Sequence, residues 1–413
     1  MRKYQSFLKN NLHYSIVEGS FWAFMFGMGE NYLSALAVFL GFSAFQISLL
    51  TSIPQFIGSF FQLFSNQLLI KIKSIKKFVV LLSYLQSFLW LVLIYIIFFC
   101  NYFIVILIWA IIYFTIAFLI NPVWISWIGY IVPRRIRGTY HGIRNRNINF
   151  FIFLAILLGG YLLDVFDNNL NYGFLILFIV AFIGRFFSSF YLNKKNDTLY
   201  EISQSANHYS FFLYNQQTRF FIIFKFLINF AIMFLGSLFT VYILRTLDMT
   251  NLILGYCGAF WWVGNIISSK YWGKFSKING NIYILKITTI LLAILPIAWI
   301  LAYYIKNEFQ LYFILFLPFL AGITFSGFSL STFNMVYDMV NRSDVVKFTS
   351  ILRFSESIGI LFSSILAGAI VDSILFNNLF INYNFTPIQF SFLISMILRF
   401  FCLFYLLKYE KLF

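Results

Sequence analysis

Long apolar runs, separated by short polar breaks, fill almost the whole chain. Twelve of them approach or exceed the length of about 20 residues that a helix needs to cross a bilayer. They lie at about residues 15–38, 45–69, 78–99, 103–130, 147–163, 171–192, 219–243, 252–269, 282–304, 309–336, 350–371 and 387–407. Residues 78–99 are continuously apolar, without the strict alternation of a membrane β-strand. The pattern predicts an all-α integral membrane protein with twelve transmembrane helices, because helices satisfy their own backbone hydrogen bonds in lipid.

The polar breaks alternate in charge, and this alternation predicts which helix ends face the cytoplasm. Lys and Arg favour cytoplasmic loops. The breaks after the second, fourth, sixth, eighth and tenth runs hold most of them, namely Lys71, Lys73, Lys76, Lys77, Arg134, Arg135, Arg137, Arg144, Arg146, Lys194, Lys195, Lys270, Lys274, Lys277, Arg342 and Lys347. The remaining breaks hold mainly acids, namely Asp164, Asp167, Asp248, Glu308 and Asp372. We predict a multi-pass protein of the cytoplasmic membrane with both termini in the cytoplasm.

The longest mostly polar stretch follows the sixth run and divides the helices six and six. We predict an N-terminal half at residues 1–193, a cytoplasmic linker at 194–218 and a C-terminal half at 219–413. When residues 134–164 are laid over residues 342–372, Gly160 meets Gly368 and Asp164 meets Asp372. This match indicates a duplication, so we expect two pseudo-symmetric six-helix halves.

Two basic loops, one in each half, carry a resemblance to a known family. The loop after the second run includes Lys71, Ser74, Lys76 and Lys77, and the loop after the eighth includes Gly273, Lys277 and Gly280. Together with the twelve runs, these loops resemble the major facilitator superfamily, whose motif between spans two and three combines glycines, an acid and basic residues. The first loop lacks both glycines, and both loops lack the acid. The first helix pair also resembles that of poorly characterised bacterial members.

The resemblance implies a secondary active transporter of the inner membrane that moves a small solute by alternating access. In this family, spans one, four, seven and ten line a central cavity, which favours Glu30, Trp124, Asn229 and Asn334 as cavity residues. We expect proton coupling, with a proton or ion gradient in place of any bound cofactor. The expected partners are a small-molecule substrate and membrane lipids, and the expected state is a monomer.

The composition excludes several other classes. Charged residues make up only 10% of the chain and hydrophobic residues 61%, whereas about a quarter of a soluble protein is charged. The net charge is +16, but the basic residues lie between apolar runs and not on one exposed face, so no nucleic-acid partner is expected. Cys100, Cys257 and Cys402 lie in apolar runs, where we expect neither disulfides nor a metal site.

Glu30 is the acid that lies deepest in a predicted span. It is past the middle of the first run, where an ionisable group costs about 2.5–3.5 kcal/mol to insert. It could bind a cationic or hydroxylated solute, carry the coupling proton, or be a structural acid satisfied by a neighbouring helix. The other substrate-site candidates, which could instead hydrogen-bond between helices, are Asn31, Gln55, Trp124, Asn229, Trp261, Asn265 and Asn334.

Five further charged residues are candidates for ion pairs or gates, namely Glu18, Arg185, Arg353, Glu356 and Arg399. Glu18 is within about one turn of the start of its run and could instead only reach the cytoplasmic interface. Arg353 and Glu356 are three residues apart and share one helical face. Such a pair would gate transport if it were exposed alternately to each side, or it would be structural at the membrane interface. The arginines of the sixth and twelfth runs could pair with acids, bind an anionic substrate or extend toward the cytoplasm. Lys225, near a cytoplasmic end, is expected to extend in that way.

A membrane-embedded enzyme acting on a lipid-linked substrate is the main alternative. It would need clustered acids, histidine ligands or a nucleophile with its base. His13, His141 and His208 are scattered through separate segments, and the sequence contains no HExxH motif. A channel would repeat a pore-lining motif, and none is visible. We therefore predict a transporter without catalytic residues.

Overall fold

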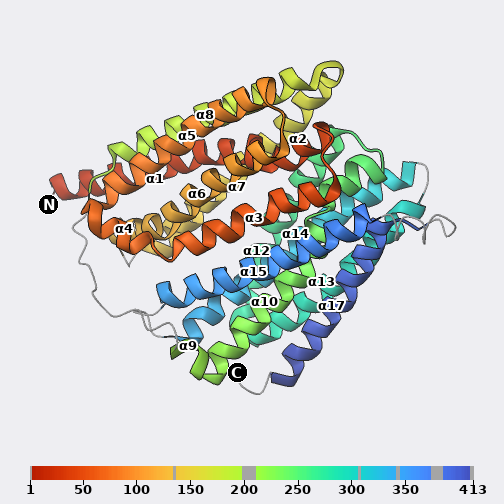
Figure 1. Cartoon of the computed structure of the whole chain (residues 1–413). Coiled ribbons are helices and arrows are strands. Elements are labelled where there is room, and N and C mark those ends of the chain that lie inside the picture. The colour runs from red at the N-terminus through yellow and green to blue at the C-terminus, as the bar shows by residue number, and fades with distance from the viewer. Residues whose placement is uncertain are drawn as a thin grey trace. The chain divides into compact units, whose positions relative to one another are not determined.

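The computed structural model is helical throughout the residues that it describes, which are 2–133, 136–197, 211–305, 308–340, 345–373 and 385–409 (Figure 1). Within these ranges there is no β-strand. Part of the predicted linker, residues 198–210, lies outside them, as do the loop residues Arg134, Arg135 and Arg342.

The helices of the first half follow the predicted runs. They are α1 (Arg2–Met28), the short 3-10 helix η1 (Glu30–Tyr32), α2 (Leu33–Phe39), α3 (Ala44–Gln62), α4 (Ser65–Ile72), α5 (Ile75–Phe99), α6 (Phe103–Ile131), α7 (Arg137–Val165), the short η3 (Asp167–Asn169) and α8 (Leu170–Lys194). The first predicted run is thus divided among α1, η1 and α2.

The second half repeats this series. It contains α9 (Phe211–Tyr214), α10 (Gln216–Gly236), α11 (Phe239–Val241), the π-helix η4 (Tyr242–Thr246), α12 (Asn251–Asn279), α13 (Asn281–Tyr304), α14 (Glu308–Met339), α15 (Val345–Asp372) and α17 (Pro387–Tyr409). Among the described residues, eleven helical segments are long and apolar enough to cross a membrane, and they match the second to twelfth predicted runs.

Contacts between residues divide the chain into two units. One unit comprises residues 1–40 and 57–205, and the other comprises residues 41–56 and 206–413. The beginning of α3 therefore belongs to the second unit by its contacts. There the Asp372 carboxylate accepts hydrogen bonds from the backbone N–H groups of Ala44 (3.2 Å) and Phe45 (2.8 Å). The acid at the end of α15 thus caps the first turn of α3.

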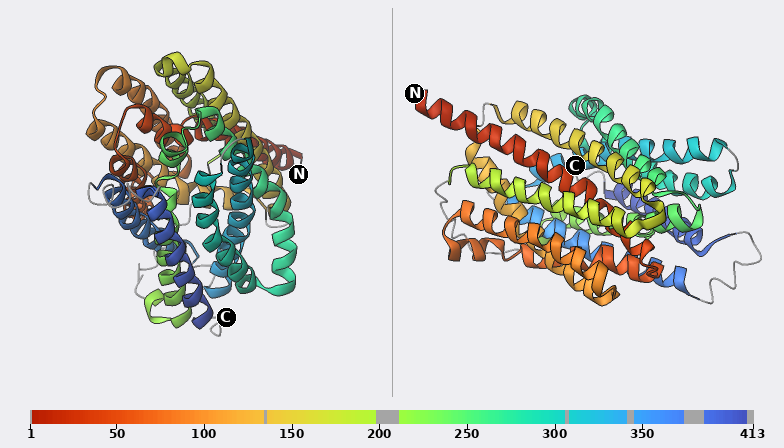
Figure 2. Two further views of the ribbon diagram at one scale, coloured as in Figure 1. Left: turned by 90° about the vertical axis from the view of Figure 1, so that its right-hand side faces the viewer. Right: turned by 90° about the horizontal axis from the view of Figure 1, so that it is seen from above.

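The same helix pairs pack in both units. In the first unit, α1 packs against α7 and α8, and α5 packs against α6 and α8. In the second, α10 packs against α15 and α17, and α13 packs against α14 and α17. The helices of the first unit, red to yellow-green, run alongside one another in both views of Figure 2. This repeated pattern confirms the predicted two-half, pseudo-symmetric fold.

The helix that opens each half is broken at a similar place. α1 ends at Met28, before Gly29, and α10 ends at Gly236. Beyond each break a fully buried tyrosine donates to a backbone carbonyl, Tyr32 to Ile156 (2.6 Å) and Tyr242 to Trp299 (2.7 Å). These hydrogen bonds attach the chain beyond each break to a neighbouring helix.

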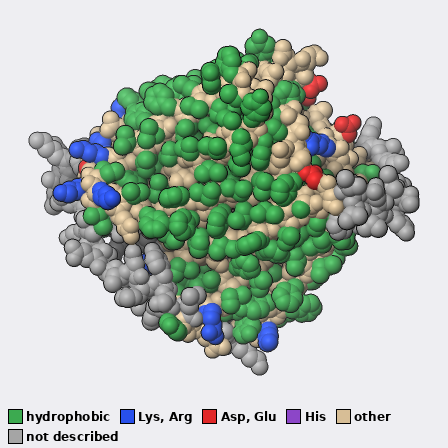
Figure 3. All heavy atoms as spheres, in the orientation of Figure 1, with side chains coloured by type: hydrophobic (Ala, Val, Ile, Leu, Met, Phe, Trp, Pro, Cys, Tyr) green, Lys and Arg blue, Asp and Glu red, His purple; other side chains and the backbone are tan. Residues whose placement is uncertain are grey.

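The outer faces of the helices are apolar. Large hydrophobic side chains within the helices, such as Ile125 of α6 and Phe401 of α17, are more than half exposed. Hydrophobic side chains cover most of the face shown in Figure 3, and the few Lys, Arg, Asp and Glu side chains visible there lie toward its edges. This distribution fits a protein whose surrounding solvent is lipid.

Two glycines bring the backbones of α12 and α14 into direct contact. A Cβ atom added to Gly264 would lie 2.2 Å from the Phe319 carbonyl oxygen, and one added to Gly322 would lie 2.0 Å from that of Trp261. Gly273 is in the same helix as Gly264, but nothing lies within 4 Å of the corresponding position.

Gly264→Ala is expected to lower the free energy of unfolding by about 1–3 kcal/mol, because the methyl group forces the two helices apart. The matched change Gly273→Ala should be neutral, or stabilising by up to about 1 kcal/mol through helix propensity. The measurement is the thermal unfolding midpoint of each purified variant in detergent. Equal midpoints for the two variants would contradict the close contact.

Candidate functional site

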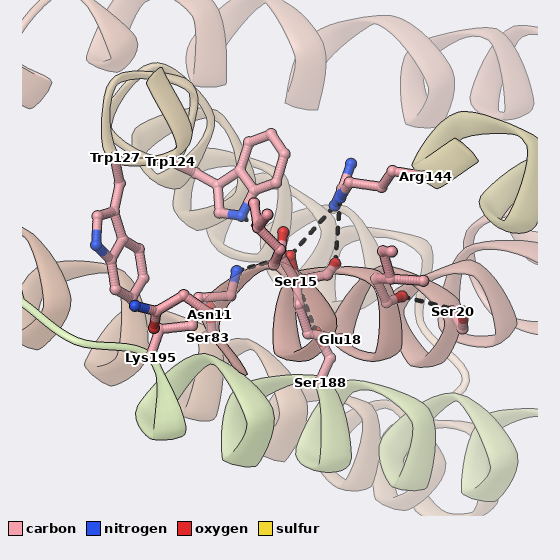
Figure 4. Close-up of polar contacts among 12 residues, drawn as sticks. Asn11, Ser15, Glu18, Ser20, Ser83, Trp124, Trp127, Arg144, Ser188 and Lys195 are labelled. Carbon is pink, nitrogen blue, oxygen red and sulfur yellow. Dashed lines mark hydrogen bonds and ion pairs between the residues drawn. The ribbon is translucent and has the colours of Figure 1, made fainter. Parts of the chain in front are cut away.

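A cluster of charged side chains is buried inside the first unit around Glu18 of α1 (Figure 4). The Glu18 side chain is 3% exposed. Its Oε1 atom lies 3.2 Å from Arg144 Nη2 and 3.1 Å from Lys195 Nζ. The indole N–H of Trp124 donates to the same oxygen (3.2 Å), and the Ser188 hydroxyl lies 3.5 Å from Oε2. One carboxylate therefore joins α1 to α6, α7 and α8.

The Glu18 cluster lies between the helices, near the ends of α6 and α8. Trp124 is seven residues before the end of α6 at Ile131, and Ser188 is six before the end of α8 at Lys194. At 1.5 Å per residue, both are about 10 Å from those ends. Since basic loops follow both helices, the cluster lies toward the predicted cytoplasmic side.

Aromatic rings cover the two cations that meet Glu18. The Arg144 guanidinium is centred 4.4 Å from the Trp124 ring, and the Lys195 ammonium lies 5.3 Å from the Trp127 ring. Such stacking compensates a cation that has lost water. Lys195 is fully buried just beyond the end of α8, and this burial lowers the pKa of its ammonium to about 8, although Glu18 opposes the shift.

Two arginines, one in each unit, are buried without a salt bridge to an acid among the described residues. Arg185 of α8 donates to the hydroxyls of Ser83 (3.1 Å) and Ser188 (3.4 Å). Arg399 of α17 donates to the backbone carbonyls of Leu292 (2.6 Å) and Ile232 (3.3 Å). Their side chains therefore point between helices and not toward the membrane surface.

A second buried acid, Glu356 of α15, organises the corresponding region of the second unit. Its Oε1 lies 2.8 Å from Lys225 Nζ, and its Oε2 lies 3.1 Å from Arg353 Nη1. The Lys225 side chain is 11% exposed, whereas that of Arg353 is 66% exposed. Glu356 and Lys225 therefore form the buried pair, and Arg353 completes it from the surface.

Glu30 lies at the break in the first helix, away from the Glu18 cluster. The Tyr113 hydroxyl donates to its carboxylate (2.8 Å) and also lies 2.9 Å from the sulfur of Met25. Tyr113 is ten residues after the start of α6 at Phe103, about 15 Å along the helix. Glu30 is partly buried, and Asn31 beside it is exposed. The structure thus presents an acid, partly accessible, well inside the span.

Aromatic rings form one wall beside Glu30. The Tyr113 ring lies 5.0 Å from Trp90 and 5.1 Å from Trp109, measured between centroids. Gly29 fits against this wall because a Cβ atom there would lie 2.5 Å from the Trp90 ring. An acid beside aromatic faces suits a cationic or hydroxylated solute, through charge, hydrogen bonds and ring contacts.

The remaining substrate-site candidates belong to the second unit. The amide groups of Gln55 and Asn229 donate to carbonyls of their own helices, those of Thr51 and Lys225 (2.8 Å each). Trp261 and Asn265 are four residues apart on α12, where Trp261 packs edge-on against Trp262. Asn334 hydrogen-bonds Asn281 and Ser276 at the loop between α12 and α13.

The basic loop between α4 and α5 receives a carboxylate from another part of the chain. Ser74 caps α5 by accepting from the Lys77 backbone N–H (3.0 Å), and its hydroxyl donates to Asp197. Asp197, which follows α8, also accepts from the Lys76 backbone N–H (3.2 Å). Lys71, near the end of α4, is exposed. Although the sequence motif lacks its acid, the folded loop therefore has one.

The loop of the second unit is built differently. Gly280 has a φ angle of +81°, a conformation that favours glycine, and it separates α12 from α13. Asn281 then bonds Ser276 (2.6 Å), Asn334 (3.0 Å) and Asp338 (2.8 Å). Gly273 and Lys277 lie within the last turns of α12. In this loop the acid is Asp338, which belongs to α14.

The charge pattern of the sequence predicts Arg144 and Lys195 as loop cations and Lys225 as a side chain that extends toward the cytoplasm. The structure buries Arg144 and Lys195, and only a small part of the Lys225 side chain is exposed. Each lies within about two turns of a helix terminus, so position along the chain did not distinguish it from a loop residue. The available signal was an acid, Glu18 or Glu356, in a span of the same half.

Together, the helical bundle and the paired charges within it define a polytopic membrane transport protein. The family model of the Major Facilitator Superfamily matches residues 16–318. The chain belongs to this superfamily, and it is therefore a secondary transporter and not an enzyme. No curated protein matches the chain in sequence.

Solved structures with the same fold include several transporters. A D-xylose-proton symporter is 13% identical with a TM-score of 0.76, and the alignment covers 97% of each chain. The nucleoside transporter NupG is 16% identical with a TM-score of 0.70, and 97% of this chain and 99% of that chain are covered. A bacterial homologue of the iron transporter ferroportin, in an inward-facing state, is 12% identical with a TM-score of 0.72 and 98% coverage of both chains. At these identities the likeness extends to the fold alone.

Glu18→Gln is expected to lower the free energy of unfolding by about 3–5 kcal/mol, because Arg144 and Lys195 would remain buried without their shared carboxylate. Adding Lys195→Met to Glu18→Gln should recover part of this loss by removing one uncompensated charge. Thermal unfolding of the two single variants, the double variant and the wild type gives the coupling between the residues. Strictly additive losses would contradict the proposed energetic coupling.

Lys225→Met and Arg353→Gln each remove one cation from Glu356, but their costs should differ. Lys225→Met breaks a buried pair and should cost about 3–5 kcal/mol. Arg353→Gln removes a mostly exposed partner and should cost about 0–1 kcal/mol. Both are measured by thermal unfolding in the same detergent, and the reverse order would show that Arg353 is the main partner.

Proposed function

We propose that this protein moves a small solute across the bacterial inner membrane by alternating access, with proton coupling through Glu30. The observation that supports this most directly is the position of Glu30, at a helix break and about 15 Å inside the bundle, where the neutral Tyr113 hydroxyl donates to its carboxylate. In contrast, Glu18 and Glu356 are each held by two cations. Glu30 is thus the acid that can lose its charge without breaking an ion pair among the described residues.

The break beside Glu30 favours a binding role. Interrupted helices form substrate and ion sites in many transporters because they expose backbone groups inside the membrane. A protonated Glu30 would donate a hydrogen bond, and an ionised one would attract a cation. Both forms fit a small hydroxylated or cationic solute bounded by Tyr113 and Trp90. The distribution of Lys and Arg supports an orientation with both termini in the cytoplasm.

Glu30→Gln should abolish solute accumulation driven by a pH gradient, because glutamine keeps the shape but carries no exchangeable charge. Exchange of labelled solute for unlabelled solute, without a gradient, should persist. The measurement is counterflow and gradient-driven uptake in proteoliposomes across a metabolite library.

Asp167→Asn is the matched control, because it removes the carboxylate of an exposed acid in η3 that is not a substrate-site candidate. It should retain both activities. Gradient-driven uptake by Glu30→Gln at the wild-type rate would exclude Glu30 as the proton carrier. If the wild type neither exchanges nor accumulates any solute, the transport proposal itself fails for the compounds tested.

A further inference from the structure

A pocket opens on the first unit beside the basic loop between α4 and α5. Its volume is about 680 Å³. Six of its lining residues come from the end of α4 and the first part of α5, and they are Ile72, Lys76, Lys77, Val80, Leu81 and Tyr84. Asn193 at the end of α8 and Asp197 just beyond it complete the lining.

The α5 residues divide the pocket into a charged end and an apolar end. Lys76, Val80 and Tyr84 follow one another at intervals of four residues, as do Lys77 and Leu81, so each series lies on one helical face. From Lys76 to Tyr84 the helix rises about 12 Å. Tyr84 contacts Phe186 of α8 edge-on, with 5.4 Å between ring centroids. The pocket thus runs from two ammonium groups to an aromatic contact.

The charged end of the pocket, which holds Lys76 and Lys77, is positive. No ion pair of Lys76 or Lys77 occurs within the described part of the chain. Asp197 is the acid in the lining, and its two oxygens already accept hydrogen bonds from the Ser74 hydroxyl and the Lys76 backbone N–H. An anionic group would therefore find two lysines with ammonium groups available to it.

Apolar side chains that line the pocket are exposed, as expected for a surface in contact with lipid. Leu81 is 55% exposed and Ile72 is 37% exposed, although both are apolar. A free inorganic anion would gain nothing from this surface, whereas an acyl chain would bury it. Basic pockets between transmembrane helices on the cytoplasmic side suit the headgroups of anionic lipids.

We propose that this pocket binds one anionic phospholipid, with its phosphate between Lys76 and Lys77 and the start of an acyl chain against Val80 and Leu81. The inference rests on the basic loop lying at the membrane interface and is independent of the transported solute. It gives the lysines of this loop a ligand of their own, in addition to their effect on topology.

The test is native mass spectrometry of the full chain in detergent, titrated with phosphatidylglycerol or phosphatidylcholine. The wild type should retain phosphatidylglycerol preferentially. Lys76→Gln combined with Lys77→Gln should weaken phosphatidylglycerol binding about thirty-fold, because each lysine near an anionic lipid contributes about five-fold. Leu81→Trp keeps the charge and fills the apolar end, and it should also weaken binding.

The matched control is Lys71→Gln combined with Lys73→Gln, which removes the same charge from neighbouring residues that do not line the pocket. It should weaken binding less than about five-fold. An equal effect of the two double variants would overturn the proposal in favour of diffuse attraction, as would equal retention of the two lipids by the wild type. Thermal stabilisation by inorganic phosphate equal to that by phosphatidylglycerol would indicate an ion site and overturn the lipid assignment.

Discussion

A charge inside the hydrocarbon must contact an opposite charge, a hydrogen-bonding partner or an aromatic face, and this requirement organises the interior of the protein. Glu18 meets it with Arg144, Lys195 and Trp124, and the contacts join α1 to three other elements of its unit. Apolar packing between helices is weakly directional in lipid, because the lipid is as apolar as the side chains. The polar contacts therefore fix which helix faces meet, while glycines and aromatic rings fill the spaces between them.

The positions of the buried acid and the buried cation are exchanged between the two units. In the first unit the buried acid is on the opening helix, α1, and a cation is on the fifth, α7. In the second unit the cation, Lys225, is on the opening helix, α10, and the acid, Glu356, is on the fifth, α15. A duplicated scaffold can exchange the signs because what matters inside the membrane is that the charges neutralise each other. The helix breaks at Gly29 and Gly236 are retained in both copies, but only the first copy places an acid directly after its break.

The fold was predictable because it depends on the length and hydropathy of the apolar runs, and both can be determined from the sequence directly. The second to twelfth predicted spans, the two halves and the family follow from those patterns. The first span was predicted as one helix, and the structure breaks it at Gly29, where the backbone packs against Trp90. The polar contacts between helices were harder to predict from the sequence. Lys195 and Asp197 follow α8 in the sequence as ordinary loop residues, and only the folded chain shows that one is buried against Glu18 and the other caps α5. Glu30 stood out from its depth alone, whereas Tyr113, its partner, is one tyrosine among many.

The contact between Gly264 and Gly322 limits how the second unit can deform. With backbone against backbone, α12 and α14 interlock, and neither can slide along the other by a helical turn without lifting out of contact. The two helices are therefore expected to move together. A displacement of one of these helices along its axis is expected to carry the other with it, which couples the two spans in any rearrangement of this unit.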